Sequence, residues 1–591
     1  MKDRENHVMR ESVKIITSGT DPDRDAWLTN FYTENHMAYE AFPDMVASPE
    51  QLNFIVHMDG EQYYYPCSDE LFTAIIEKRA DTLLTPAFIR IWSRLEKLVR
   101  EVIIDPYRRQ YLLSLLTIKY QHDTSSMVLL PSRLEKRLLG IFTNISDISR
   151  PLAARRELEN KRVARFLASR DFLDAFNGRE GLRINEETTL DDIDLQVHLL
   201  RLQRLLLLST VKEIWEEEQP PDMNELRRIM NTPIETEGWQ WFCERLAQVL
   251  SGQHKPYLLW LGGRAGEIVF DLAIIRILMK LGIKVILAVK QAFYYEHISF
   301  ADVLEDPVLE KAMSGAEVIG DSRISKKELL GKLDKDNRLL VISDGTGEQF
   351  NPLLTSVTFA RAFKESDLVI SRCPESRECI NNHFQFTRDL VSILREDTGK
   401  LAIHLKPHHP AVIRFSEADL RAKAQHLIYM ARKEKEKGKK IMFYSAIVGS
   451  IPGQLETAKK ILNVFVEHLR STLTDVVIIN PGEHFEEGMD ADDIMYMWEI
   501  FQRSGVIDIW RFQTYSDIEK AFELMGEKVP PEWTGKDATY STGCTKEMQI
   551  ALEMQQKYPE MQLIGPPWEK FKRRQEYGIG KLYDRVLTDT K

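Results

Sequence analysis

Between residues 257 and 405, hydrophobic positions form short continuous runs separated by stretches with helical spacing. Tyr257–Leu261 and Lys284–Val289 are apolar runs of strand length, and residues 268–281 between them repeat at helical spacing. A strand, a helix and a strand at these distances predict a right-handed parallel βαβ unit. Further short strands are expected at residues 339–343, 367–371 and 400–405. The pattern predicts an α/β core with a mostly parallel, doubly wound sheet.

The same pattern divides the rest of the chain. Apolar positions recur at helical spacing through most of residues 131–250, and Thr189 with Asp192 forms a capping-box-like helix start. The run 431–440 is charged on every side, which fits either a solvated helix end or a linker. After it, strands and helices alternate again. We expect a mostly helical accessory region at residues 1–130, a helical domain at 131–250, the α/β core at 251–435 and a second α/β domain at 436–591.

Length and composition narrow the protein class. A chain of 591 residues is too long to fold around one hydrophobic core, so its length favours about two to four domains. The net charge of -11 argues against nucleic acid as a partner, because phosphate backbones require clustered Lys and Arg. The most apolar stretch carries Arg201 and Arg204 and is too short for a membrane span. The five cysteines form no CxxC pair, so a reducing cytoplasm is expected.

A candidate ligand site follows the first strand of the core. Ligands of doubly wound sheets bind beyond the carboxyl ends of the strands, and residues 262–267 occupy such a position before a helix. Gly263 and Gly266 would let an anion approach backbone N–H groups, and Arg264 adds a planar positive group. The plainer alternative is a tight turn, with Arg264 in a surface salt bridge to Glu267.

Residues 261–271 resemble a known family signature. The string Ala-Gly-Glu-Ile-Val-Phe-Asp, ending at Asp271, is similar to the strand-end motif of the damage-control phosphatase family, whose fold includes an acidic-residue methyltransferase-like branch. Residues 289–290, 299–306 and 363–371 resemble, in the same order, the family's next strand, its acidic helix and a late strand. The resemblance covers roughly residues 255–410. It implies a divalent-metal site that hydrolyses phosphorylated small metabolites.

The metal-ligand positions of that family are replaced in this chain. By alignment, the family's Asp-Asn pair and second Asp fall on Gly263, Arg264 and His297. Glycine and arginine cannot ligate a hard cation, and histidine suits zinc-like ions. The family's phosphate loop falls on residues 372–378 and keeps its first positive residue and its last Glu. The resemblance therefore implies a degenerate metal site that binds an anionic, phosphorylated or carboxylated metabolite through Gly263, Arg264, Gly266, Glu267, Arg372 and Lys406.

Two alternatives stay open. The first is an active metal-dependent phosphatase with a shifted ligand set, His297, Asp302 and Asp344, although Asp344 also fits a plain turn. The second is a structural or assembly subunit that binds a protein partner through the N-terminal helical region. The sequence leaves the catalytic residues, the metal, the ligand and the oligomeric state undetermined.

Overall fold

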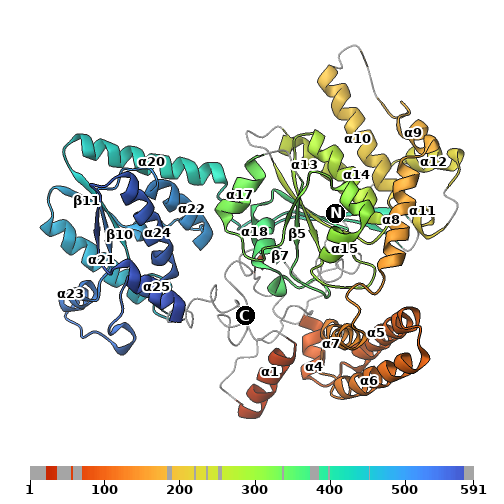
Figure 1. Cartoon of the computed structure of the whole chain (residues 1–591), viewed down its shortest axis with the longest axis horizontal. Helices are drawn as coiled ribbons and strands as arrows, with labels where there is room; N and C mark the ends of the chain where they lie inside the picture. The colour runs from red at the N-terminus through yellow and green to blue at the C-terminus, as the bar shows by residue number, and fades with distance from the viewer. Residues whose placement is uncertain are drawn as a thin grey trace, which may run out of the picture. The chain divides into compact units, whose positions relative to one another are not determined.

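The computed structural model describes residues 21–35, 55–56, 69–182, 185, 189–217, 221–234, 237–250, 256–335, 339–372, 385–396, 400–451 and 453–577. The chain divides into two compact units, residues 1–410 and 411–591. Figure 1 shows both units, coloured along the chain. The finer domain boundaries expected near residues 130, 250 and 435 stay predictions.

The first unit is built on a seven-stranded sheet. Its strand order is β4-β5-β3-β2-β6-β8-β9, and all neighbours are parallel except β8 and β9. This architecture confirms the predicted α/β fold with a mostly parallel, doubly wound core. The strands are β2 (Tyr257–Leu261), β3 (Lys284–Val289), β4 (Glu317–Ile319), β5 (Leu340–Ser343), β6 (Leu368–Ser371), β8 (Leu390–Arg395) and β9 (Leu401–Lys406).

Helices cover both faces of this sheet. All of β3 is buried, as expected for a continuous apolar run in a parallel sheet. The crossover from β2 to β3 through α14 (Glu267–Lys280) runs in the opposite direction along the sheet to the crossover from β5 to β6 through α18 (Val357–Glu365). Because such crossovers are right-handed, α14 and α18 lie on opposite faces. The chain therefore adds strands on one side of β2 first and on the other side from β6 onward, so the direction of strand addition changes between β2 and β6. Further helices follow β3 and β4, namely α15 (Phe300–Glu305), α16 (Pro307–Ala312) and α17 (Lys326–Lys335).

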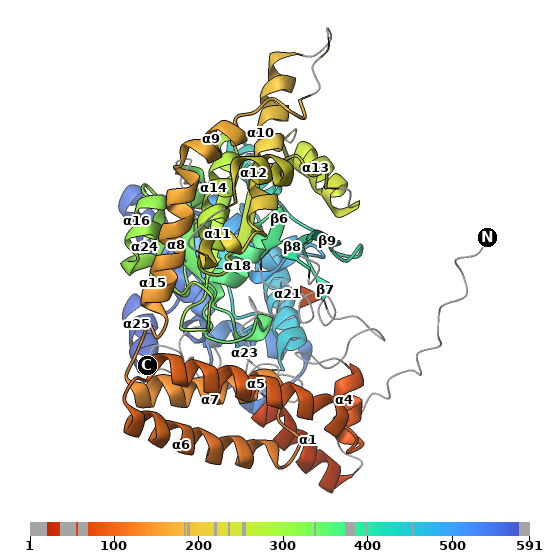
Figure 2. The ribbon, with the colours of Figure 1, turned by 90° about the vertical axis from the view of Figure 1, so that its right-hand side faces the viewer.

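The N-terminal part of this unit is helical. Helices α5, α6 and α7 pack against one another, and α6 lies on the outside of this layer (Figure 2). The helices are α1 (Pro22–Glu34), α4 (Asp69–Ile76), α5 (Asp81–Val102), α6 (Pro106–Thr124) and α7 (Pro131–Ser146). The short strands β1 (Ile55–Val56) and β7 (Gln385–Phe386) form a separate antiparallel pair.

A second group of helices shares one hydrophobic core with the sheet. Phe166 and Trp215 from these helices join Trp260 of β2 and Phe270 of α14 in this core. The predicted capping box at Thr189 is present at the start of α10. The group comprises α8 (Ala153–Leu167), α9 (Arg170–Phe176), α10 (Leu190–Leu208), α11 (Glu213–Glu216), α12 (Met223–Met230) and α13 (Glu237–Leu250).

The second unit contains a four-stranded parallel sheet with the order β11-β10-β12-β13, which confirms the predicted second α/β fold. The charged run 431–440 is the end of α20 and the turn into β10. The helices and strands of the second unit are α20 (Glu417–Glu436), β10 (Lys440–Ser445), α21 (Leu455–Thr472), β11 (Val476–Ile479), α22 (Ala491–Gln502), β12 (Ile509–Phe512), α23 (Tyr515–Met525), α24 (Thr542–Lys557), β13 (Gln562–Ile564) and α25 (Trp568–Tyr577). Within the described ranges of both units, no helix combines the length and hydrophobicity that crossing a membrane requires.

Candidate functional site

The carboxyl ends of β2 and β6 mark the position where a doubly wound sheet binds its ligand. The two ends are level, because Leu261 of β2 pairs with Ser371 of β6. The loop that leads into α14 begins after Leu261, and Arg372 follows Ser371 directly. The structure therefore brings the glycine-containing loop and Arg372 together.

Arg372 is fully buried and bonded to protein on every side of its guanidinium group. Its Nε donates to Asp271 Oδ1 at 3.0 Å, and its Nη2 donates to Glu267 Oε1 at 2.7 Å. Nη2 also donates to Ser209 Oγ at 2.7 Å, and Nη1 donates to the carbonyl of Ile393 at 3.2 Å. Two carboxylates from the first turns of α14 thus neutralise this guanidinium. An external phosphate would have to displace them.

The same two carboxylates explain why residue 263 is a glycine. A Cβ atom at Gly263 would lie 2.6 Å from Glu267 Oε2 and 3.3 Å from Asp271 Oδ2. The N–H of Gly263 donates to Asp271 Oδ2 at 3.3 Å, and the N–H of Arg264 donates to Glu267 Oε2 at 3.4 Å. Burial raises the pKa of Asp271, and the guanidinium of Arg372 opposes that rise. Glu267 and Asp271 are therefore built into a closed network.

The backbone at the start of α14 is also occupied. Gly266 adopts a φ of 73°, and its N–H donates to Asn160 Oδ1 of α8 at 2.7 Å. The N–H of Ala265 donates to the carbonyl of Glu296 at 3.0 Å. Trp215 packs so closely that a Cβ at Gly266 would lie 2.4 Å from its ring. Protein oxygen atoms thus take the positions that an anion would occupy at this helix N-terminus.

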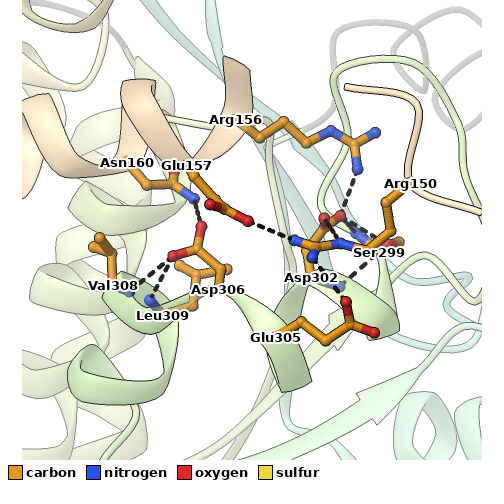
Figure 3. A network of polar contacts seen from close by, with 10 residues as sticks. All are labelled: Arg150, Arg156, Glu157, Asn160, Ser299, Asp302, Glu305, Asp306, Val308 and Leu309. Carbon is orange, nitrogen blue, oxygen red and sulfur yellow. Dashed lines mark hydrogen bonds and ion pairs between the residues drawn. The ribbon is translucent and has the colours of Figure 1, made fainter. Parts of the chain in front are cut away.

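Helix α8 holds this edge of the sheet through a network of charged and polar side chains (Figure 3). Arg156 donates to one oxygen of Asp302, and Arg150 Nε donates to the other at 3.0 Å. Asn160 Nδ2 donates to Asp306 Oδ2 at 2.7 Å. Although burial alone would raise the pKa of Asp302, the nearby arginines and the cap of α15 lower it. Asp302 is therefore a structural anion that joins α8 to α15.

A second buried ion pair lies at the ends of β3 and β5. Lys290 Nζ is 2.8 Å from Asp344 Oδ2 and donates to Thr346 Oγ1 at 3.2 Å. Asp344 Oδ1 also accepts the N–H of Thr346 at 2.7 Å. Nearby, Glu348 forms a buried salt bridge with Arg133 of α7. Burial raises the pKa of Glu348, and Arg133 opposes the rise.

The three residues of the shifted metal set do not form a common site. Asp302 pairs with arginines, and Asp344 pairs with Lys290. His297 is buried, and its ring centre lies 5.3 Å from that of Tyr294. Among the residues that the structure describes, no group of three or more His, Cys, Asp or Glu side chains could hold a metal ion. The side chains of the described residues do not fit the divalent metal that the family resemblance implies.

Lys406 lies away from Arg372, contrary to the expected grouping. Strand β9 runs antiparallel to β8, so Lys406 pairs with Leu390, the first residue of β8. The carboxyl end of β6 is instead level with Ser392. Lys406 therefore lies toward the amino ends of the parallel strands. The sequence did not indicate this position, because an apolar run predicts a strand but not the direction in which the strand runs. The last Glu of the expected phosphate loop, Glu378, lies outside the described residues.

Several residues of this network carry no distinguishing mark in the sequence. Arg156 and Asn160 belong to a helix in which charged and polar residues are frequent. Ser209 follows a leucine-rich helix and resembles any residue of a helix end. Asp271 stands within the family-like string, and that string is the one available signal for its importance. Tertiary contacts alone identify the other three residues.

No protein-family model matches this chain, and no curated protein matches it. Among solved structures, it is similar to a DUF89 family protein from Pyrococcus horikoshii. The TM-score is 0.36 and the sequence identity is 14%, with 52% of this chain and 90% of that chain covered. The chain thus has a distant structural neighbour in the DUF89 family.

Proposed function

We propose that this chain is a diverged damage-control-phosphatase-like protein that binds a small anion without metal-dependent hydrolysis. The observation behind this proposal is the buried ion pair of Arg372 with Glu267 and Asp271. These carboxylates hold a guanidinium group instead of facing a bound cation. A guanidinium stays protonated and coordinates no water, so it neutralises charge but does not generate a metal-bound nucleophile.

Within the predicted anion-binding set, we assign the ligand to Arg264. It is partly buried in the loop between β2 and α14. Arg372 is engaged by its internal partners, and Lys406 lies away from this position. Burial alone would raise the pKa of Glu296, but Arg94 and, more weakly, Arg264 lower it. An anion bound at Arg264 therefore competes with Glu296, which favours a doubly charged phosphate over a single carboxylate.

Two measurements test this function. The full chain, purified without chelator, is analysed for bound metal and assayed with a panel of small phosphate esters. Its melting temperature is then measured with inorganic phosphate, pyrophosphate and citrate. The matched control is Arg276→Ala, because Arg276 is an exposed arginine of α14 that bonds to the carbonyl of Ala312.

We expect no stoichiometric metal, no turnover, and a rise in melting temperature that Arg264→Ala abolishes and Arg276→Ala leaves intact. Stoichiometric metal together with turnover that His297→Ala removes would instead establish the phosphatase alternative. An equal rise in the wild type and in Arg264→Ala would remove Arg264 from the site. A chain that binds neither metal nor anion would leave the assembly role as the surviving function.

A further inference from the structure

Glu296 is a carboxylate held between arginines at the edge of the candidate site. Arg94 of α5 donates from Nη2 to Glu296 Oε2 at 2.9 Å. On the other side, Arg264 and His297 pair in an isolated antiparallel β-bridge, and the N–H of Ala265 donates to the carbonyl of Glu296 at 3.0 Å. Burial would raise the pKa of Glu296, yet Arg94 and, more weakly, Arg264 hold it below its usual value. Two arginines from distant parts of the chain therefore act on one charged carboxylate.

Aromatic packing fixes the orientation of Arg94. Its Cζ atom lies 3.5 Å from the ring centre of Tyr295. A guanidinium stacked on a ring directs its N–H groups sideways, toward partners at its edge. One such partner is Glu135, 3.7 Å from Arg94 Nη1, which is buried and also accepts a hydrogen bond from the hydroxyl of Tyr294 at 2.9 Å. The other is Glu296, whose side chain is 33% exposed, so Glu296 is the partner that an external anion can replace.

The backbone beside Glu296 is strained. Tyr295 has a φ of 45°, in the left-handed region that a bulky aromatic residue rarely adopts. The turn is closed by the N–H of His297, which donates to the carbonyl of Tyr294 at 3.1 Å. Strain of this kind is typical of ligand sites and of segments that switch between two conformations. Its relief would offset part of the cost of separating Glu296 from Arg94.

We infer that Glu296 occupies the position of a ligand phosphate, and that Arg94 joins Arg264 in binding this phosphate after Glu296 has turned away. The inference rests on the proposed anion binding at Arg264, and it adds the ligand class and a second binding residue. Two guanidinium groups that share one carboxylate suit the dianion of a phosphate monoester, which has more charge and more acceptor oxygens than a carboxylate. A ligand carboxylate would gain nothing over Glu296. Glu159 of α8 also interacts with the charge of Glu296, but it is paired with Arg155 at 2.9 Å.

The test is isothermal titration calorimetry of the full chain with inorganic phosphate and, separately, with acetate at the same ionic strength. The variants are Glu296→Gln, Arg94→Gln and the double variant, and thermal unfolding shows whether each keeps its fold. The matched controls are Arg100→Gln and Glu328→Gln. Arg100 lies on the same helix as Arg94 with its side chain 59% exposed, and the side chain of Glu328 on α17 is 51% exposed.

We expect Glu296→Gln to bind phosphate at least tenfold more tightly than the wild type, because the competing carboxylate is gone. Adding Arg94→Gln to this variant should weaken phosphate binding at least tenfold. Acetate should not bind measurably, and both controls should bind phosphate as the wild type does.

Three results would contradict the inference. If the double variant binds phosphate as tightly as Glu296→Gln, Arg94 does no more than hold Glu296, and the inference is overturned. Unchanged binding in Glu296→Gln, while Arg264→Ala still abolishes it, would overturn this inference and leave the proposed function intact. No phosphate binding in either the wild type or Glu296→Gln would overturn the proposed function and this inference with it.

Discussion

Replacing Arg372 by methionine tests the central feature of the first unit. Methionine keeps most of the side-chain volume but removes the positive charge and every donated hydrogen bond. Asp271, which is completely buried, would then face no cation, and Ser209 and the carbonyl of Ile393 would lose their donor. Removing one partner of a buried ion pair costs about 3–5 kcal/mol, because the remaining charge stays buried. Each lost hydrogen bond adds about 1 kcal/mol.

The stability lost in Arg372→Met should depend on pH in a defined direction. Burial already raises the pKa of Asp271, and the variant lacks the guanidinium that opposes this rise. A carboxyl group whose pKa is higher in the folded state binds its proton more tightly there, so its contribution to stability falls as pH rises above the unfolded value. Arg372→Met should therefore cost about 4 kcal/mol or more at pH 8 and about half as much at pH 5.5.

The assay is urea unfolding at both pH values, followed by hydrogen exchange of peptides from β2 and β6. Peptides from β10 and β12 of the second unit serve as the internal reference. Arg395→Met is the control, because Arg395 lies in the same sheet, with its side chain 30% exposed and 4.0 Å from Glu213. That control should cost under about 0.5 kcal/mol. A second variant, Asp271→Asn with Arg372→Met, should regain part of the loss. An unchanged β2 and β6 stability at pH 8, or an equal loss at both pH values, would refute the reasoning.

Three other predictions concern backbone and buried groups. Gly266→Ala should destabilise the first unit by about 3 kcal/mol, since the φ of Gly266 is 73° and Trp215 fills the space that a Cβ atom would need. The control is Gly282→Ala, whose Cβ would meet no atom within 4 Å and which should cost about 1 kcal/mol. Both costs are measured by thermal unfolding. Asn160→Ala should cost about 2 kcal/mol and speed hydrogen exchange at Gly266, because that N–H loses its acceptor. Burial raises the pKa of the Glu547 carboxyl group to about 7. The stability that its bound proton contributes to the folded state is therefore complete below pH 4.5 and is lost as pH rises through 7. Glu547→Gln should consequently be more stable than wild type by about 2–3 kcal/mol at pH 8 but not at pH 4, measured as urea midpoints of the second unit.

The hydrophobic pattern alone determined the elements that form the two cores. Tyr257–Leu261 and Lys284–Val289 have the predicted bounds, because a strand buried on both faces must be apolar along its whole length. The capping box at Thr189 was equally readable, since it depends on residues three positions apart. The three-residue strand β4 was not predicted, because so short a run carries too little periodicity. These features are local, and local features are what a single sequence records.

The sequence by itself thus determined the α/β class and most of the strands. That the metal-ligand positions of the similar family fall on Gly263 and Arg264 stays a prediction of the sequence comparison. Only the tertiary structure decided which groups the charged and polar side chains of the candidate site contact. Arg372 meets Asp271 across 101 residues, and Asn160 meets the N–H of Gly266 across 106 residues. Lys406 was separated from them by the antiparallel direction of one strand. The physical reason is that a buried charge is stabilised by its neighbours in space, and strand order and register choose those neighbours independently of sequence spacing.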